Sequence, residues 1–217
     1  MSGPFKGMYQ SSEGVFSVWY PRILGVYERE LFPVFEEIVN MKPARIVDVG
    51  AAEGYLAIGF MKRLPDVQMV AFEMLERGRE VIHYFADKNG FDEGLTIMGE
   101  ADEKELSAVL AEEIEGDQVL IMDIEGYEEV LLNPKKIVGL GKTHVLVELH
   151  EFAVPNVGEL IKKRFDESHD ILEISVEERS TEDLPMKLKG WPRRVWRELL
   201  DEYRPPGVSW LWMQPKA

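Results

Sequence analysis

Four side chains that can carry a charge or a proton follow two apolar stretches of the chain. Asp123 and Glu125 follow the run Val119–Met122, and Glu148 and His150 come at the end of the next apolar run. Residues two apart in a strand share one face, so each pair is expected to point the same way. Imidazole titrates near neutral pH, and a hydroxyl must lose its proton as its oxygen forms a bond. We therefore predict that His150 is a catalytic base and that Asp123 and Glu125 act beside it.

The same groups allow two other interpretations. Asp123, Glu148 and His150 are candidate ligands for a hard divalent cation, which would lower the pKa of a hydroxyl. Alternatively, these side chains only hold the loops in place and stabilise the start of the helix expected near Gly126. We predict a site without a metal and keep the three residues as candidate ligands.

The stretch Asp48–Tyr55 has the composition of a tight turn between a buried strand and a helix. Its small residues let a ligand approach the backbone closely. The helix that follows points free N–H groups at that ligand. Asp48 is expected to anchor the turn and to complement a positively charged part of the ligand. The predicted ligand-binding residues here are Asp48, Gly50, Ala51, Ala52, Gly54 and Tyr55.

Acidic residues also end the next two expected strands. Glu73 can accept both hydroxyls of a ribose, and Glu100 can accept from the amino group of an adenine. Ala101 leaves room for the ring. Met74, beside Glu73, and Asp123 are further predicted cofactor-binding residues. A nucleoside with a positively charged sulfonium tail suits these acids better than a dinucleotide, whose pyrophosphate is repelled by them. The predicted cofactor is therefore S-adenosyl-L-methionine.

Strands and helices alternate from residue 45 onward, which predicts a parallel sheet with helices on both faces. Continuous apolar runs such as Val119–Met122 are typical of strands covered on both sides. The expected strands are Arg45–Gly50, Gln68–Glu73, Leu95–Met98, Gln118–Asp123, Thr143–Leu149, Ile171–Val176 and Val208–Met213.

Several short motifs together resemble those of one enzyme family. They are Asp48-Val49-Gly50-Ala51, Phe72-Glu73, the run Asp123–Glu128 and Glu148-Leu149-His150. In this order they are similar to the motifs of FkbM-type methyltransferases, within the class I S-adenosylmethionine-dependent methyltransferases. The likeness covers roughly residues 44–152. The chain departs from the family at Ala52, where Asn is frequent, and at Met74, where Pro is frequent.

The resemblance implies a fold and an activity. The implied fold is α/β, a Rossmann-like doubly wound sheet of seven strands in the order 3-2-1-4-5-7-6, with an antiparallel last strand and three αβα layers. The implied activity is methyl transfer to a hydroxyl of a small molecule or sugar. The methyltransferase domain is expected over residues 42–217, with an acceptor-specificity insertion near 177–207.

Residues 1–41 are expected to form a flexible segment and a helix. Residues 1–14 are rich in Gly and Ser, which predicts mobility. Residues 22–40 have helical periodicity, and Pro33 should bend or split that helix. The aromatic side chains of the segment are either a lid over a substrate or packing, and we favour packing; they are Phe5, Tyr9, Phe16, Trp19 and Tyr20.

A local basic cluster lies in the expected insertion. It interleaves with Trp191 and Trp196 and consists of Lys187, Lys189, Arg193, Arg194 and Arg197. One interpretation is recognition of an acidic or sugar-phosphate acceptor. We favour the other, a solvated amphipathic helix whose tryptophans pack on the sheet.

Composition limits the class of protein. The chain has 217 residues, no cysteine and a formal net charge of −15. The lack of cysteine excludes thiol catalysis, disulfides and cysteine-ligated metals, and the charge disfavours nucleic acid or an anionic membrane as a partner. We expect a soluble cytoplasmic protein with a small-molecule acceptor, and the oligomeric state stays open, a homodimer included.

Two other functions fit the residues. One is a module of the same fold that binds the cofactor or a nucleoside without turnover. The other is a nicotinamide-dependent oxidoreductase, which would share Glu73 but would need a G-x-G-x-x-G turn. The chain has small residues at 50, 52 and 54 instead. We therefore rank the oxidoreductase below methyl transfer.

Overall fold

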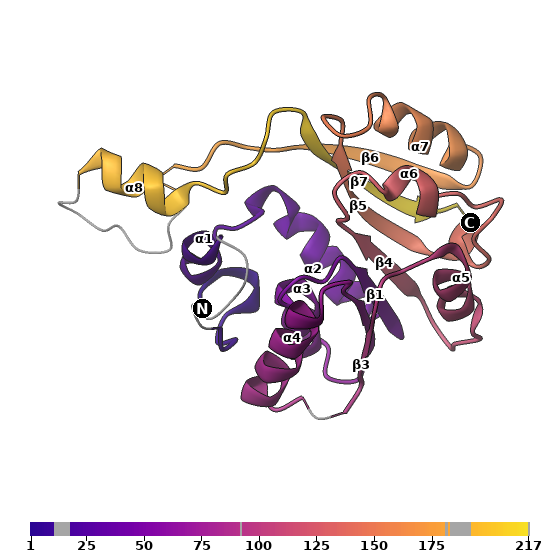
Figure 1. The fold of residues 1–217 in the computed structure, drawn as a ribbon, viewed down its shortest axis with the longest axis horizontal. Helices are drawn as coiled ribbons and strands as arrows, with labels where there is room; N and C mark the ends of the chain where they lie inside the picture. Colours follow the sequence, from indigo (N-terminus) through magenta and orange to yellow (C-terminus); the bar gives the residue numbers. More distant parts are fainter. Residues whose placement is uncertain (11–17, 92, 181, 183–191, 217) are drawn as a thin grey trace.

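The strands of the computed structural model form one mixed sheet in the order β3-β2-β1-β4-β5-β7-β6, which confirms the predicted fold class (Figure 1). The structure describes all residues except 11–17, 92, 181, 183–191 and 217. Within that part of the chain the strands are β1 Arg45–Val49, β2 Gln68–Phe72, β3 Leu95–Met98, β4 Gln118–Met122, β5 His144–His150, β6 His169–Ser175 and β7 Val208–Pro215.

Strand direction brings the expected site residues to one edge. Strands β1 to β5 pair in parallel, so their carboxyl ends lie at the same edge of the sheet. Strand β7 lies antiparallel between β5 and β6, as expected for the last strand. Strand β5 extends one residue beyond the predicted end, because His150 still pairs with Val208 of β7.

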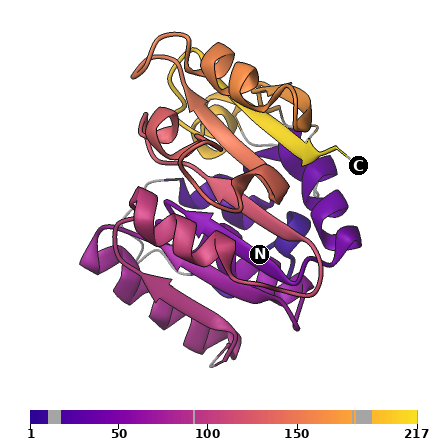
Figure 2. The same cartoon turned by 90° about the vertical axis from the view of Figure 1, so that its right-hand side faces the viewer.

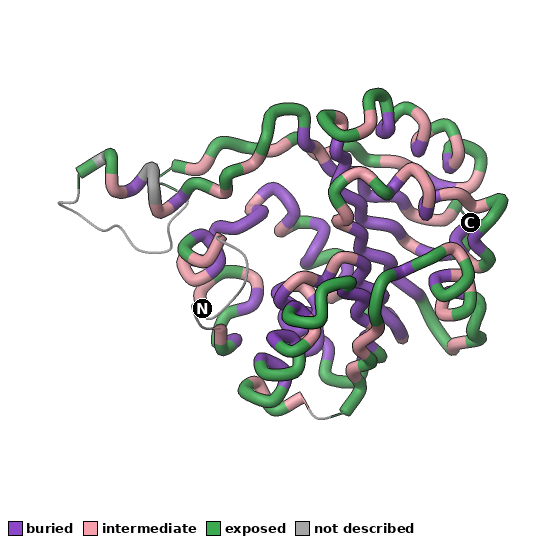
Figure 3. The backbone as a smooth tube through the Cα atoms, in the orientation of Figure 1, coloured by how far each residue is buried: buried purple, intermediate pink, exposed green. Residues whose placement is uncertain are grey.

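Helices cover both faces of the sheet and make three layers (Figure 2). One face carries α2 Phe32–Met41, α3 Tyr55–Arg63 and α4 Glu76–Asn89; the other carries α5 Glu103–Ala111, α6 Glu128–Leu131 and α7 Val157–Phe165. Alternation along β1 explains the two cores: Ile46 packs with the first group, and Val47 and Val49 pack with the second. The central strands are buried along their length (Figure 3).

The helical segment before β1 is divided, but not at Pro33. Helix α1, Trp19–Leu24, ends at Gly25, whose φ of 75° is the left-handed conformation that stops a helix. A short 3₁₀ turn, η2 Arg29–Leu31, leads into α2. Pro33 lies in the first turn of α2, where its missing N–H costs no helical hydrogen bond. The predicted split is therefore correct in kind, and its position is corrected to Gly25.

The first residues pack on the domain. The 3₁₀ turn η1 Gly3–Phe5 inserts Phe5, which is buried against the rings of Phe35, Tyr55 and Phe60. Packing was the favoured interpretation for this aromatic. Tyr9 and Tyr20 are exposed. Phe16 lies outside the described residues, and the mobility of residues 1–14 stays a prediction.

Helix α8, Arg193–Leu200, stands away from the sheet in the connection between β6 and β7 and packs on α1 (Figure 1). Trp196 and Leu200 are buried beside Val26 of the N-terminal segment. Trp196 is therefore packed, as favoured, but not on the sheet, where the prediction placed it. The rest of the predicted basic cluster is largely undescribed: Lys187, Lys189 and Trp191 lie outside the described residues, as do the side chains of Arg193 and Arg197. Among the helices that the structure describes, none combines the length and the apolarity that crossing a membrane requires.

Candidate active site

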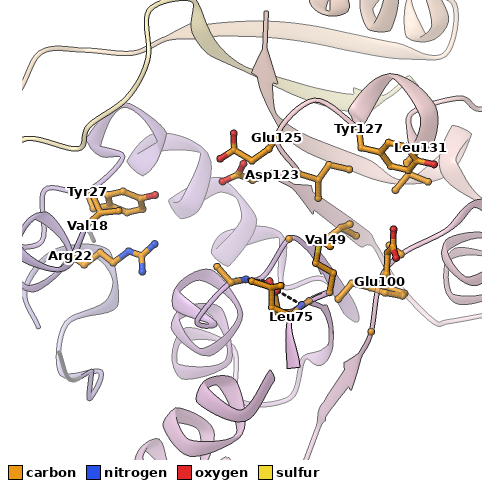
Figure 4. Close-up of a pocket in the computed structure, with 18 residues that line it drawn as sticks. Val18, Arg22, Tyr27, Val49, Leu75, Glu100, Asp123, Glu125, Tyr127 and Leu131 are labelled. Atoms are coloured by element: carbon orange, nitrogen blue, oxygen red, sulfur yellow. Dashed lines mark hydrogen bonds between the residues drawn. The ribbon is translucent and has the colours of Figure 1, made fainter. Parts of the chain in front are cut away.

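A cavity of about 520 Å³ opens at the carboxyl edge of the sheet. Its wall is formed by residues after β1, β2, β3 and β4 and by three residues of the N-terminal segment, Val18, Arg22 and Tyr27 (Figure 4). The size is ordinary for a small-molecule site. Predicted site residues that line it are Gly50, Ala52, Glu73, Met74, Glu100, Ala101, Asp123 and Glu125.

The turn after β1 is held against the end of β4. Gly50 has a φ of 87°, and a Cβ placed on it would lie 1.8 Å from the backbone oxygen of Asp123. Only glycine fits both the conformation and the space. Ala52 adopts a φ of 51°, which is unusual for a residue with a side chain. The turn thus brings its backbone beside Asp123 at the floor of the cavity.

Glu73 fastens this turn to the next loop. One carboxylate oxygen accepts a hydrogen bond from the N–H of Ala52 at 2.9 Å, and the other accepts from the N–H of Leu75 at 2.7 Å. Each oxygen keeps a further lone pair. The buried carboxylate can therefore orient the loops and still accept from a ligand hydroxyl.

Four predicted ligand-binding residues support the cavity wall from behind. Ala51, Gly54 and Tyr55 are buried, and Asp48 lies under the turn with 3% of its surface exposed. Burial, with the nearby charge of Asp123, raises the pKa of Asp48 to about 7. None of the four is among the residues that line the cavity, and the role of Asp48 as an anchor of the turn stays a prediction.

His150 lies behind Asp123 and Glu125. Its Nε2 atom is 3.5 Å from a carboxylate oxygen of each. His150 is buried, whereas both carboxylates line the cavity. The predicted catalytic groups are therefore brought together, but Asp123 and Glu125 are the ones that a ligand can touch.

Glu128 is a member of this group that the sequence interpretation did not assign. Its Oε1 lies 2.6 Å from Nδ1 of His150 and also accepts from the N–H of Gly126 at 3.2 Å. Its side chain is fully buried. The sequence contained a signal for this residue, because Glu128 is the last residue of the Asp123–Glu128 motif.

The environment of His150 favours its charged form. Burial lowers the pKa of His150, but the hydrogen bond to Glu128 and the charges of Glu128, Asp123 and Glu125 outweigh it, so the pKa is raised. When the imidazole is neutral, Nδ1–H donates to Glu128 and Nε2 is left to take a proton on the side of Asp123.

The three candidate metal ligands converge, but one of them is already paired. Ligand atoms of Asp123, Glu148 and His150 lie within 4.8 Å of one another. Glu148, however, forms an ion pair with the partly buried Arg204. Burial and the charge of Asp123 raise the pKa of Glu148, and the charge of Arg204 opposes this shift. A cation at this position would have to displace Arg204 from Glu148.

Arg204 belongs to a buried network that links distant segments. It pairs with Glu28 at 2.6 Å and with Glu202 at 3.1 Å, in addition to Glu148. Arg179 pairs with the same Glu202 at 2.6 Å. The network joins the N-terminal segment, β5 and the connection between β6 and β7 behind the cavity. Apart from Glu148, no local motif marks these residues, and sequence reasoning missed them.

Arg22 is a second missed residue, and it lines the cavity. It comes from α1, which carries no recognisable binding motif. Its Nη1 pairs with Glu53 at 3.1 Å, and its guanidinium lies over the rings of Tyr27 and Tyr55 at 4.7 and 5.0 Å.

Known proteins resemble this chain in structure and not in sequence. No protein-family model and no curated protein sequence matches it. Among solved structures, the O-methyltransferase TomG from Streptomyces achromogenes, in complex with SAM, is 12% identical with a TM-score of 0.59, over 98% of this chain and 93% of that one. The C-terminal domain of precorrin-6Y C5,15-methyltransferase from Rhodobacter capsulatus is 13% identical with a TM-score of 0.53, over 85% and 89%.

A third similar structure is P. horikoshii TYW2 in complex with MeSAdo, 14% identical with a TM-score of 0.51, over 94% of this chain and 65% of that one. At such identities the likeness concerns the fold. Together with the observed strand order, these structures establish that the chain has the Rossmann-like fold of class I methyltransferases.

Proposed function

We propose that this protein is an S-adenosylmethionine-dependent methyltransferase that acts on a hydroxyl of a small molecule or sugar, with FkbM-type enzymes as its relatives in motif. One observation carries the proposal. Asp123 lines the cavity beside the turn at Gly50, and the same carboxylate lies 3.5 Å from Nε2 of His150. A donor site and a proton acceptor thus meet at one residue.

The residues present fit the methyl donor. The wall around Gly50 has no room for a side chain, so a ligand can rest on the backbone. Glu73 can accept from ribose hydroxyls, and Glu100 can accept from the adenine amino group. Four acidic side chains line a cavity that would take a ligand with two positive centres; they are Glu73, Glu100, Asp123 and Glu125. We call the part formed by the turn, Glu73 and Glu100 the cofactor end, and the part around Asp123, Glu125 and His150 the acceptor end.

The chemistry requires removal of a proton. When bound, S-adenosylmethionine supplies a methyl group that passes to the acceptor oxygen as the carbon–sulfur bond breaks. Asp123 contacts the acceptor and takes up the hydroxyl proton as the new carbon–oxygen bond forms. His150, held by Glu128, receives or stabilises that proton through Nε2. Positioning of the two substrates within the cavity supplies much of the remaining rate enhancement.

A binding module without turnover is the second candidate. It is favoured by the burial of His150, which has only 3% of its surface exposed and is separated from the cavity by Asp123 and Glu125. In that case the network around His150 would serve only to hold the loops after β4 and β5.

Calorimetry followed by turnover assays separates these functions. We expect S-adenosylmethionine and its demethylated product to bind at micromolar concentration and NAD not to bind. No heat from the methyl donor at millimolar concentration would end the proposal. Binding without methylation of any member of a broad panel of hydroxyl compounds would support the binding module.

A further inference from the structure

Acidic residues outnumber basic residues among the described residues that line the cavity. Four are acidic, whereas Arg22 is the one cation among the described lining residues. Figure 4 shows Arg22 across the cavity from Glu100, with its guanidinium directed toward the interior. A ligand that spans the cavity therefore meets acids along most of its length and a single guanidinium at one end.

The guanidinium of Arg22 is held in one orientation. Its Cζ lies over the rings of Tyr27 and Tyr55, at 4.7 and 5.0 Å from the ring centres, and Nη1 donates to Glu53 at 3.1 Å. Only 6% of the residue is exposed. These contacts fix the position of the guanidinium, whose remaining N–H groups can still donate to a ligand.

One N–H of this guanidinium lacks a hydrogen-bond partner. Among the described residues, Nε of Arg22 is buried and has no acceptor within reach. Guanidinium has five N–H donors arranged to grip a carboxylate with two parallel bonds. A buried donor without an acceptor is costly, so a carboxylate brought into the cavity at this point would be stabilised.

Arg22 is attached to the cofactor end. Glu53, its ion-pair partner, directly follows Ala52 in the turn after β1, and Tyr55 begins the helix after that turn. Its hydrogen bond and ring contacts among the described residues are with Glu53, Tyr27 and Tyr55, and not with Asp123 or Glu125 at the acceptor end. A carboxylate bound by Arg22 would therefore belong to the ligand that rests on the turn.

We propose that Arg22 binds the α-carboxylate of the methionine part of the methyl donor, an inference that rests on the proposed function. The donor has one carboxylate and two positive centres, which matches one guanidinium among several acids. With the nucleoside at Glu73 and Glu100, the methionine part extends past Gly50 toward Arg22. Arg22 is thus a cofactor-binding residue supplied by the N-terminal segment.

Decarboxylated S-adenosylmethionine is the direct probe, because it differs from the donor by this carboxylate. Calorimetric titration of the wild-type chain with each compound gives a ratio of two dissociation constants. We expect the carboxylated compound to bind about 10- to 100-fold more tightly, because it gains a charge-assisted bidentate contact. In Arg22→Met the preference should fall below about threefold, with the larger loss in binding of the carboxylated compound.

Matched variants separate binding from folding. Arg22→Met leaves Glu53 without this ion pair, so Arg22→Met/Glu53→Gln should restore thermal stability but not the preference. Arg22→Lys keeps the charge and should keep part of the preference. Arg77→Met removes an exposed arginine of α4 that pairs with Glu80 outside the cavity, and it should leave the ratio unchanged.

Three results would overturn the inference. They are a wild-type chain that binds both compounds equally, an Arg22→Met variant that weakens both by the same factor, and a variant that raises KM for an acidic acceptor while donor binding is unchanged. The last would assign Arg22 to the acceptor. A wild-type chain that binds neither compound is a different failure, because it removes the proposed function itself.

Discussion

The cofactor end of the cavity is held by backbone geometry within neighbouring loops, whereas the acceptor end is held by buried ion pairs between distant segments. At the cofactor end, Glu73 accepts from backbone N–H groups of Ala52 and Leu75. At the acceptor end, Arg204 reaches Glu148, 56 residues away, and Glu28, 176 residues away. The first kind of site depends on conformation, and the second depends on charge pairing and on the whole fold.

This difference predicts that adding a single methyl group at Gly50 abolishes donor binding at the cofactor end. Gly50→Ala places a Cβ where the backbone oxygen of Asp123 lies 1.8 Å away, in a left-handed conformation. We expect donor binding to be lost, by at least about 1,000-fold, and the free energy of unfolding to fall by about 3 kcal/mol. Calorimetry and urea denaturation measure the two effects.

The control for this change is Gly141→Ala, where a Cβ meets no atom within 4 Å. It should leave donor affinity unchanged and change stability by less than about 1 kcal/mol. Normal donor affinity in a folded Gly50→Ala protein would show that the turn does not form the donor site.

At the acceptor end the largest effect should be on turnover. Asp123→Asn keeps the size of the side chain but removes the group that takes the hydroxyl proton. We expect kcat to fall by about 100- to 10,000-fold, with donor affinity within tenfold of wild type. Single-turnover methylation and calorimetry on the same protein provide the comparison. An unchanged rate would exclude Asp123 from proton transfer.

The long-range ion pairs should matter for stability. Arg204→Met leaves Glu28, Glu148 and Glu202 without their shared cation, and we expect the free energy of unfolding to fall by about 3–5 kcal/mol. Urea denaturation measures the loss. Arg77→Met, which removes an exposed arginine paired with Glu80, is the matched control and should cost less than about 1 kcal/mol. Equal losses in the two variants would contradict a special role for the buried network.

The smallest effect should be a shift of the pH profile. The pKa of His150 is raised, and only the neutral imidazole accepts a proton, so kcat/KM should rise with pH through an apparent pKa above the usual value of histidine. Glu128→Gln removes the charge that raises it. The rising limb should therefore move to lower pH, with a rate within about tenfold of wild type at high pH. A limb that stays in place would mean that His150 does not set the profile.

The cofactor end was more predictable from the sequence than the acceptor end. The strands and the turn with its strand-end acids were predictable from local pattern, because β-branched runs, small residues and Glu73 are close together in the chain. The strand order was implied by the family resemblance and not by that pattern. The acid–base group was predicted in part. The spacing of Asp123 and His150 indicated it, but the order of the groups, with His150 behind the carboxylates, depends on how β4 and β5 lie side by side.

Other parts could not be predicted from local pattern. Arg22 and Arg204 lie in segments without a motif, and their roles arise only when α1 and the residues before β7 meet at the sheet edge. Pro33 was taken as the point of division in the first helix, but Gly25 ends α1, since a left-handed residue stops a helix while a first-turn proline is tolerated.

A crystal structure of the chain with S-adenosylmethionine or its demethylated product tests the central claim most directly. The account predicts that the nucleoside lies along Glu73 and Glu100, with the sulfur beside Asp123 and the methionine carboxylate on Arg22. Ligand density elsewhere on the chain, or a cavity that stays empty at millimolar ligand, would contradict it.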